Sequence, residues 1–332
     1  MCKDCEDSGL EREEYKVKRL FWTLYHAWRE FLREGHVMKD AEYREGRMAA
    51  RIIRLVHSIE KGLSIEAPRP GFGYDKIKKL SAMVQEYVRL EEPNMTCVYA
   101  ACDAMEAYIA FHDAKDFQTK EYMEIKGMYE RMKPYRLSAP GQQRYGGVLR
   151  IQKSDLDYDV EEIEKLFATR HSVREFSGKV PLEDVKKAIE LAGRAPSACN
   201  RQAVRVYMID SRQYLKDMKT NLAGVGGFAE DAEYFLLITG KLSAYEQEYN
   251  QFIVSAGIFA GYLSLALQTY HIASCIIQRS LRREDRWEKF CELHKIPGDE
   301  QIVCMMAIGG MKDEMTVPVS VRYEPEDIFR VL

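Results

Sequence analysis

The first half of the chain repeats its apolar residues with the period of an α-helix. Between residues 20 and 32 large apolar side chains recur every three or four positions, which places them on one helix face. They are Leu20, Phe21, Leu24, Tyr25, Trp28, Phe31 and Leu32. The same spacing predicts further helices over residues 41–61, 74–90, 96–112 and 120–133. Residues 1–150 thus predict an all-α region of unknown role. We expect these N-terminal helices to pack on the second half of the chain or on a partner subunit, because the apolar stripe of the first helix would otherwise face water.

The pattern changes after residue 141. Short apolar runs of strand length now alternate with helical segments. Strands are predicted at residues 148–151, 204–209, 234–239, 272–277 and 302–308, and helices at 160–168, 182–192 and 252–267. We place the boundary between residues 142 and 157 and predict an α+β domain over residues 157–332.

Residues 249–278 contain no charged side chain, and their length approaches that of a membrane span. Polar residues are scattered through this run, and no second run of this kind follows it. Gly257 and Gly261 form a small-xxx-small pattern, which lets another helix approach closely. We therefore expect a core or subunit-interface helix rather than a membrane helix.

Composition narrows the class of protein. The 332 residues include 49 Lys and Arg against 52 Asp and Glu, a net charge of −3, so no global basic field favours nucleic acid. The charged N-terminus has no apolar signal-peptide core, which predicts a cytoplasmic protein whose eight cysteines are reduced thiols. Cys2 and Cys5 form a CxxC pair, but no second pair at zinc-site spacing accompanies them, so no metal is expected.

Two segments offer binding chemistry. Arg170, Ser172 and Arg174 follow a short predicted helix, and two guanidiniums flanking a hydroxyl can cradle a phosphate. By itself this Arg pair is equally compatible with a solvated surface. Some twenty residues later, residues 195–202 read APSACNRQ and lead into a predicted strand, so a loop could present small polar groups at a fixed place. By itself this loop could also be a plain helix-to-strand turn.

Together the two segments resemble the nitroreductase family of FMN-dependent oxidoreductases. That family carries an R-x-S-x-[RK]-x-[FY] segment, then P-S-x-x-N-x-Q-P before a strand, and an Arg near the C-terminal end; here these are residues 170–176, 196–203 and Arg322. The resemblance covers residues 157–332. It implies a nitroreductase-like fold, in which a central, mainly antiparallel sheet is flanked by helices.

The resemblance also implies roles for individual residues. Arg170, Ser172 and Arg322 would hold the FMN phosphate, with His171 beside them, and Arg174 would reach the pyrimidine edge of the flavin. Pro196, Ser197, Asn200 and Gln202 would contact the same flavin from the other subunit of a homodimer. The strand at Ile276 and Ile277 would pass near the hydride-accepting nitrogen. No side chain is named as catalytic, because the cofactor supplies the chemistry.

The expected activity is a ping-pong transfer of electrons from NAD(P)H through FMN to a small acceptor such as a quinone or nitro compound. Ala203 replaces the motif's last Pro, Ser320 replaces a second basic residue common in the family, residues 271–278 lack its Gly-rich pattern, and its usual Asn aligns only loosely with Asn221. One alternative is therefore a non-catalytic module that serves a partner. Another is a specialised flavin dehydrogenase tied to polysaccharide biosynthesis, because residues 57–63 and the Pro-Gly-Phe-Gly loop resemble a nitroreductase-like subgroup with a helical N-terminal extension.

Two further patterns are weak. Gly224, Gly226 and Gly227 suggest a dinucleotide loop, but no strand leads into them. His57 and Glu60 share one helix face as metal ligands do, yet no matching pair lies on another predicted helix.

Overall fold

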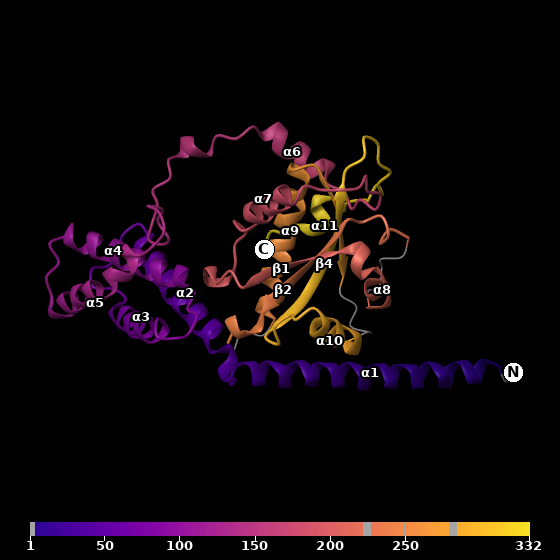
Figure 1. Cartoon of the computed structure of the whole chain (residues 1–332), viewed down its shortest axis with the longest axis horizontal. Coiled ribbons are helices and arrows are strands. Elements are labelled where there is room, and N and C mark those ends of the chain that lie inside the picture. Colours follow the sequence, from indigo (N-terminus) through magenta and orange to yellow (C-terminus); the bar gives the residue numbers. More distant parts are fainter. Residues whose placement is uncertain (1–3, 222–226, 247, 249, 279–283) are drawn as a thin grey trace.

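The computed structural model describes residues 4–221, 227–246, 248, 250–278 and 284–332. An N-terminal helical region comes first, and an α+β region follows it (Figure 1). The helical region consists of α1 (Asp4–Val37), η1 (Ala41–Tyr43), α2 (Arg44–Leu63), α3 (Tyr74–Tyr87), α4 (Met95–Asp113) and α5 (Lys120–Leu137).

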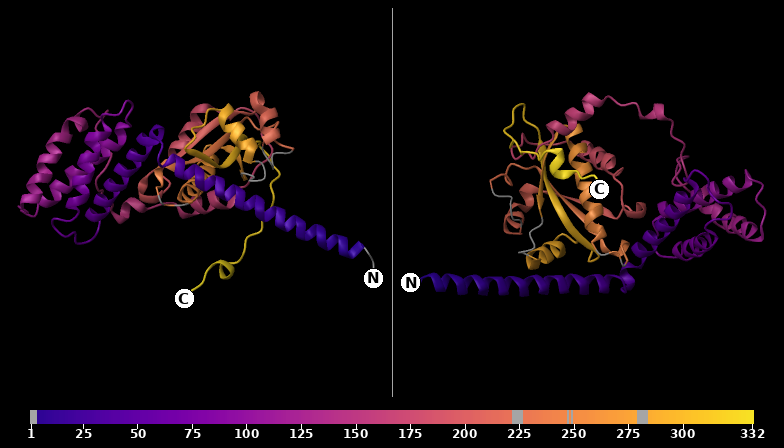
Figure 2. Two further views of the ribbon diagram at one scale, coloured as in Figure 1. Left: turned by 90° about the horizontal axis from the view of Figure 1, so that it is seen from below. Right: turned by 180° about the vertical axis from the view of Figure 1, so that it is seen from behind.

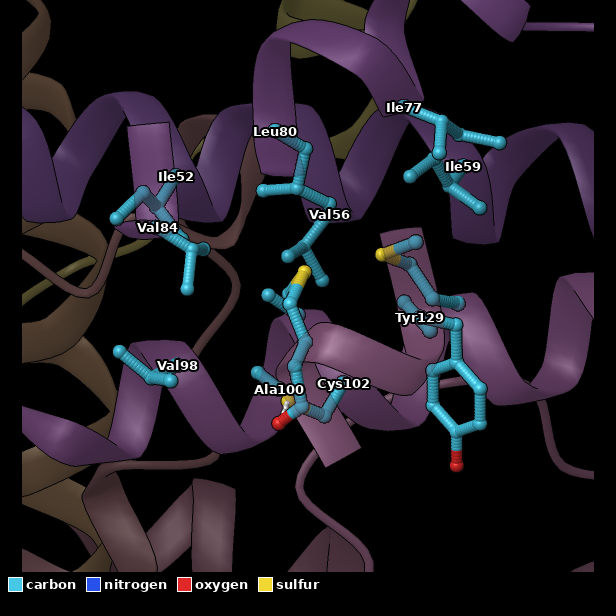
Figure 3. Packing of buried hydrophobic residues seen from close by; sticks show 14 of the residues in the cluster. Ile52, Val56, Ile59, Ile77, Leu80, Val84, Val98, Ala100, Cys102 and Tyr129 are labelled. Atoms are coloured by element: carbon cyan, nitrogen blue, oxygen red, sulfur yellow. Dashed lines mark hydrogen bonds between the residues drawn. The ribbon is translucent and has the colours of Figure 1, made fainter. Parts of the chain in front are cut away.

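Helices α2 to α5 form a bundle around one apolar core (Figure 3). Ile52, Val56 and Ile59 of α2 face Ile77, Leu80 and Val84 of α3, and all six are buried. Side-chain caps set two of the helix starts, because Asn94 accepts a hydrogen bond from the Thr96 amide and Thr119 accepts one from the Tyr122 amide. The predicted helices of this bundle are confirmed.

Residues 138–159 connect the two regions, and η2 (Lys153–Leu156) interrupts them. The strand predicted at residues 148–151 is wrong, because this segment is irregular. Leu149 and Ile151 are exposed, and a strand needs a partner edge that this surface segment does not meet. The Gly147 amide, just before it, donates to the Glu60 carboxylate on α2 instead.

The α+β region is built on a four-stranded antiparallel sheet of order β1-β2-β4-β3. Its strands are β1 (Val204–Asp210), β2 (Tyr234–Lys241), β3 (Ile272–Gln278) and β4 (Glu300–Gly310). The antiparallel sheet flanked by helices confirms the predicted fold class.

Helices cover both faces of the sheet (Figure 1). α7 (Leu182–Ala192) and α9 (Gln251–Thr269) pack on one face, where Leu236, Ile238 and Met306 are buried. On the other face Leu237, Met305 and Cys275 share a core with residues of α8 (Ser211–Asn221) and α10 (Glu284–Leu293). The alternation of these side chains along each strand matches the two-residue period of a sheet buried on both sides. The remaining helical elements are α6 (Val160–Thr169), η3 (Ala198–Asn200), η4 (Leu242–Ala244) and α11 (Pro325–Ile328).

Helix α1 runs as a long rod along the α+β region (Figures 1 and 2). It is attached by polar contacts, since Arg29 pairs with Glu288 of α10 and Arg33 donates to the Gly298 carbonyl. Its apolar stripe faces away, with Phe21 67% and Trp28 59% exposed. The N-terminal helices thus contact the second half of the chain as expected, through α1 and also through Arg51 of α2, but the stripe itself does not make this contact, because the polar face of α1 does. Packing on a partner subunit stays a prediction.

The uncharged run, residues 249–278, includes helix α9 and then strand β3. Helix α9 is its long apolar part. Among the described residues it is the one helix that is long and apolar enough to cross a membrane. Of its 18-residue apolar stretch, 44% is buried inside the protein. Buried core helices of soluble proteins can have the same length and composition. One side of α9 packs on α7 and the sheet, as expected for a core or interface helix.

Candidate flavin site

The segment after α6 lies beside the edge of the sheet. The Val173 amide donates to the Ser274 carbonyl of β3 at 2.9 Å, and the Ser177 amide donates to the Gly310 carbonyl of β4 at 2.9 Å. Val173 and Phe176 are buried anchors, whereas Ser172 is half-buried and Arg174 is exposed. The buried residues fix this segment against the sheet, and the polar residues between them stay accessible to a ligand.

Ser172 and Arg174 lie close to Cys275 of β3. Burial raises the pKa of the Cys275 thiol, and both the Arg174 charge and a hydrogen bond from Ser172 partly offset this rise. The Arg174 guanidinium also lies 6.0 Å from the centre of the Phe228 ring. The segment predicted to bind phosphate, residues 170–174, therefore lies beside β3, the strand that contains Ile276 and Ile277.

Ile276 and Ile277 do not offer equivalent side chains. Ile277 is 5% exposed and belongs to the core on the α8 and α10 side, whereas Ile276 is 42% exposed. Successive side chains of a strand point to opposite faces. Of the two side chains, only that of Ile276 is open to a ligand.

Arg170 and His171 face different hollows. Arg170 lines an open one of about 700 Å³ with Gly257, Gly261 and Tyr262 of α9. His171 lines another of about 570 Å³ with residues that include Met311 and Met315.

The second motif forms a strained loop. Cys199, Asn200 and Gln202 have φ values of 51°, 54° and 48°, the left-handed region that residues other than glycine rarely adopt. Hydrogen bonds inside the loop hold it, since the Gln202 amide donates to Ser197 Oγ at 3.0 Å and Gln202 Nε2 donates to Asn200 Oδ1 at 3.2 Å. Three polar side chains are therefore presented together at the surface.

A separate cavity of about 330 Å³ adjoins this loop. Pro196, Ser197 and Gln202 line it together with Val206, Ser255 and Phe259. Ser255 is 1% exposed, and a hydrogen bond with its hydroxyl partly offsets the rise that burial causes in the pKa of Tyr245. The Ser255 hydroxyl therefore has Tyr245 as a neighbour and also belongs to the wall of this cavity. Ser255 was missed by sequence reasoning, because a single serine in an apolar helix carries no spacing signal.

Arg322 lies apart from the other predicted residues. It is on the C-terminal arm, residues 311–332, where Val321 is 90% and Tyr323 is 81% exposed. Its guanidinium donates to carbonyls of the same arm, those of Ser320 and Val321. Within one chain Arg322 is therefore not joined to Arg170, and its phosphate role stays a prediction.

The comparisons with known proteins identify the region that carries both motifs. The model of the nitroreductase family matches residues 167–225 and 221–310. A protein of Archaeoglobus fulgidus, provisionally named NADH dehydrogenase/NAD(P)H nitroreductase, is 28% identical over 173 residues, which are 51% of this chain and 94% of that protein. The α+β region matches the nitroreductase family, and we call it the nitroreductase region.

Two solved structures align with the same half of the chain. One is a provisionally named nitroreductase from Bacillus subtilis (18% identity, TM-score 0.47), which covers 52% of this chain and 100% of that one. The other is a nitroreductase with bound FMN from Desulfitobacterium hafniense (21% identity, TM-score 0.41), which covers 52% of this chain and 98% of that one.

The family match includes both motifs and β3 of the nitroreductase region, but it ends before Arg322 and begins after the helical region. The helical region therefore stands outside the matched residues.

The other patterns found in the sequence do not add a site to this nitroreductase region. Among the residues described, no group of three or more His, Cys, Asp or Glu could hold a metal ion. Glu60 is engaged by the Gly147 amide, and burial raises its pKa. Gly224 and Gly226 lie outside the described residues, as does Cys2, and the side chains of Cys5 and Asn221 are not described.

Proposed function

We propose that this chain is an FMN-dependent oxidoreductase that takes electrons from NAD(P)H and passes them to a small acceptor, such as a quinone or a nitro compound, by a ping-pong mechanism. The observation that carries this proposal is the backbone hydrogen bond by which Val173, between Ser172 and Arg174, joins β3 in the region that matches the nitroreductase family. The names of the matched proteins, which include NAD(P)H and bound FMN, support the choice of electron donor and cofactor.

The residues present fit FMN in two respects. Arg170 and Ser172 offer charged and neutral donors of the kind that phosphate binds, and Arg174 offers a positive charge for the pyrimidine edge. The Ser255 hydroxyl, in the wall of the cavity beside Ser197 and Gln202, offers a further polar group where a ligand could lie.

The division of labour between cofactor and chain follows from these groups. Bound FMN would supply hydride acceptance and release. Arg174 would stabilise negative charge at the pyrimidine edge, and Arg170 with Ser172 would bind and orient the phosphate. Because one site would serve donor and acceptor in turn, the oxidised nucleotide, NAD(P)+, must leave before the acceptor binds.

We also propose that the active form is a homodimer. The hollow that Arg170 lines and the cavity that Ser197 lines are separate, and different residues of α9 border each of them. α9 also exposes apolar side chains, with Val254 52% and Tyr262 46% exposed. A second copy packed on this face would cover these side chains and could bring Ser197 and Asn200 of one chain to Arg170 of the other.

Purification and reconstitution test the proposal directly. We expect the protein to bind FMN in titrations of flavin absorbance and fluorescence, and NADH or NADPH to bleach the flavin under anaerobic conditions. Reoxidation rates across quinones and nitro compounds would identify the acceptor, and parallel lines in double-reciprocal plots would support the ping-pong order. A colourless protein that rejects added FMN would overturn the proposal in favour of a non-catalytic module. A flavoprotein that NAD(P)H does not reduce would instead favour a specialised dehydrogenase.

A further inference from the structure

The strained loop of residues 196–202 is held by one buried arginine. Arg201 has a side chain only 2% exposed, although its neighbours Asn200 and Gln202 are exposed. Its Nε donates to the Ala198 carbonyl inside the loop at 2.9 Å, and its Nη1 donates to the Ala244 carbonyl of η4 at 3.0 Å. The guanidinium also pairs with Glu248 and lies 4.4 Å from the centre of the Tyr245 ring. Arg201 therefore ties the loop to residues 244–248.

Those residues are in turn held by helix α2 of the helical region. Arg51 makes a two-pronged contact with the Glu246 carboxylate, at 3.0 Å from Nε and 2.7 Å from Nη2. Arg54 lies 3.9 Å from the Glu248 carboxylate, the same group that pairs with Arg201. Paired, planar contacts of this kind fix orientation as well as distance.

Apolar packing supports the same junction. Ala50 of α2 is buried in one cluster with Ala203, Ala244 and Tyr245. A Cβ on Gly46 would lie 2.9 Å from Cε and Nζ of Lys241, so the end of the Lys241 side chain lies against α2. α2 thus has two roles, because its other side forms the bundle core.

We propose that Arg201 is a positioning residue for the flavin site, and that α2 holds it in place through Arg51, Arg54, Glu246 and Glu248. The helical region would then determine the shape of a loop to which it contributes no residue. Left-handed conformations at Cys199, Asn200 and Gln202 persist only where surrounding contacts fix them. If α2 no longer fixed residues 244–248, the loop would relax and Ser197, Asn200 and Gln202 would lose their common orientation. The link to cofactor binding rests on the proposed function.

Charge exchange across the junction provides the test. Arg51→Glu and Glu246→Arg should each weaken FMN binding at least threefold, and the double variant should restore it to within twofold of wild type. Arg201→Lys keeps the charge but loses the planar fork, and should weaken FMN binding at least tenfold. Arg44→Glu is the matched control, since Arg44 also lies on α2 and pairs with Glu86 inside the helical region. It should leave FMN binding unchanged.

A second measurement does not depend on the cofactor. Cys199 is a half-buried free thiol within the loop, so its alkylation rate, read by mass spectrometry on the FMN-free protein, reports how tightly the loop is held. We expect both single charge reversals to raise this rate at least threefold, and the double variant to return it to the wild-type rate. Rates that follow this pattern in a protein unable to bind FMN would uphold the positioning and overturn the proposed function. Single reversals that leave the alkylation rate within twofold, or a double variant that fails to restore it, would overturn the inference, even where Arg201→Lys fails to fold.

Discussion

The two regions of this chain differ in how completely they bury their apolar surface. The α2–α5 bundle closes on itself, since one core of side chains from all four helices is buried (Figure 3). Of its buried polar side chains, Asp103 pairs with Arg136 of α5 and His112 accepts from the Gly71 amide, whereas the Ser81 hydroxyl has no partner among the described residues. The nitroreductase region buries both faces of its sheet but leaves the outer side of α9 and the C-terminal arm exposed. A closed core needs no partner, whereas an open apolar face does. The open faces also border the predicted flavin contacts, so assembly and cofactor binding should depend on each other.

The sharpest test of this difference is Gly257→Leu in α9. A Cβ at Gly257 meets no described atom of its own chain within 4 Å, so the larger side chain has room within one chain and would enter the open hollow that Arg170 lines, where a second molecule would pack. We expect sedimentation to show loss of the dimer, and flavin titration to show loss of FMN binding in the same sample. Gly127→Leu on α5 is the control, because a Cβ there meets only Arg131 Nη1 at 3.9 Å. A Gly257→Leu protein that remains a flavin-loaded dimer would show that this face is not the interface.

The closed bundle should instead be sensitive to its buried ion pair. Asp103 is 1% exposed and accepts hydrogen bonds from Arg136 and from the Tyr145 amide. Asp103→Ala leaves the Arg136 charge without its carboxylate, which should lower the free energy of unfolding by about 3 kcal/mol in urea titrations. The control is Glu130→Ala, which removes an exposed pair with Lys133 and should cost less than about 1 kcal/mol. Equal effects of the two variants would contradict the picture of a bundle fixed by its interior.

At the open edge of the sheet, Arg170→Ala should weaken the cofactor contact without unfolding the protein. Removing one charge-assisted hydrogen bond to a phosphate costs about 1.5–3 kcal/mol, which corresponds to roughly a tenfold or greater rise in the FMN dissociation constant. Arg212→Ala is a suitable control, because Arg212 is an exposed arginine of the same region and pairs with Glu233. An unchanged dissociation constant for Arg170→Ala would remove Arg170 from the phosphate site.

The sequence predicted helices and strands correctly where the regular spacing of apolar residues extends over many positions. Helix α7 has its predicted bounds of residues 182–192, and β3 extends one residue beyond its prediction. The short helices α8 and α10 were missed, because each has too few apolar positions to establish a period. α1 extends back to Asp4 through charged residues that carry no apolar spacing. The strand expected at residues 148–151 failed because strand length and composition do not supply a partner edge.

Within the candidate site, the motif residues could be named from sequence, but the groups that support them could not. Arg201 lies inside the second motif, yet its role depends on Ala244 and Glu248, more than forty residues away. Arg51 belongs to a different region altogether. Such contacts arise only when the chain folds, so spacing along the sequence does not reveal them.

The smallest expected effect is a pH dependence inside the closed bundle. His112 is buried; its Nε2 accepts from the Gly71 amide at 2.9 Å, and its Nδ1 lies 2.8 Å from the Tyr108 carbonyl. This arrangement fits a neutral ring, and burial lowers the pKa of His112 below its ordinary value of 6.5. The unfolded chain therefore binds a proton more readily than the folded chain as pH falls below about 6.5, and stability must decrease in that direction.

We expect urea midpoints to fall between pH 8 and pH 5.5, and His112→Gln to reduce this fall because glutamine does not titrate. A His112→Gln protein with the wild-type pH dependence would show that acid sensitivity arises elsewhere, and the bundle interior would then not be the part of the molecule that senses pH.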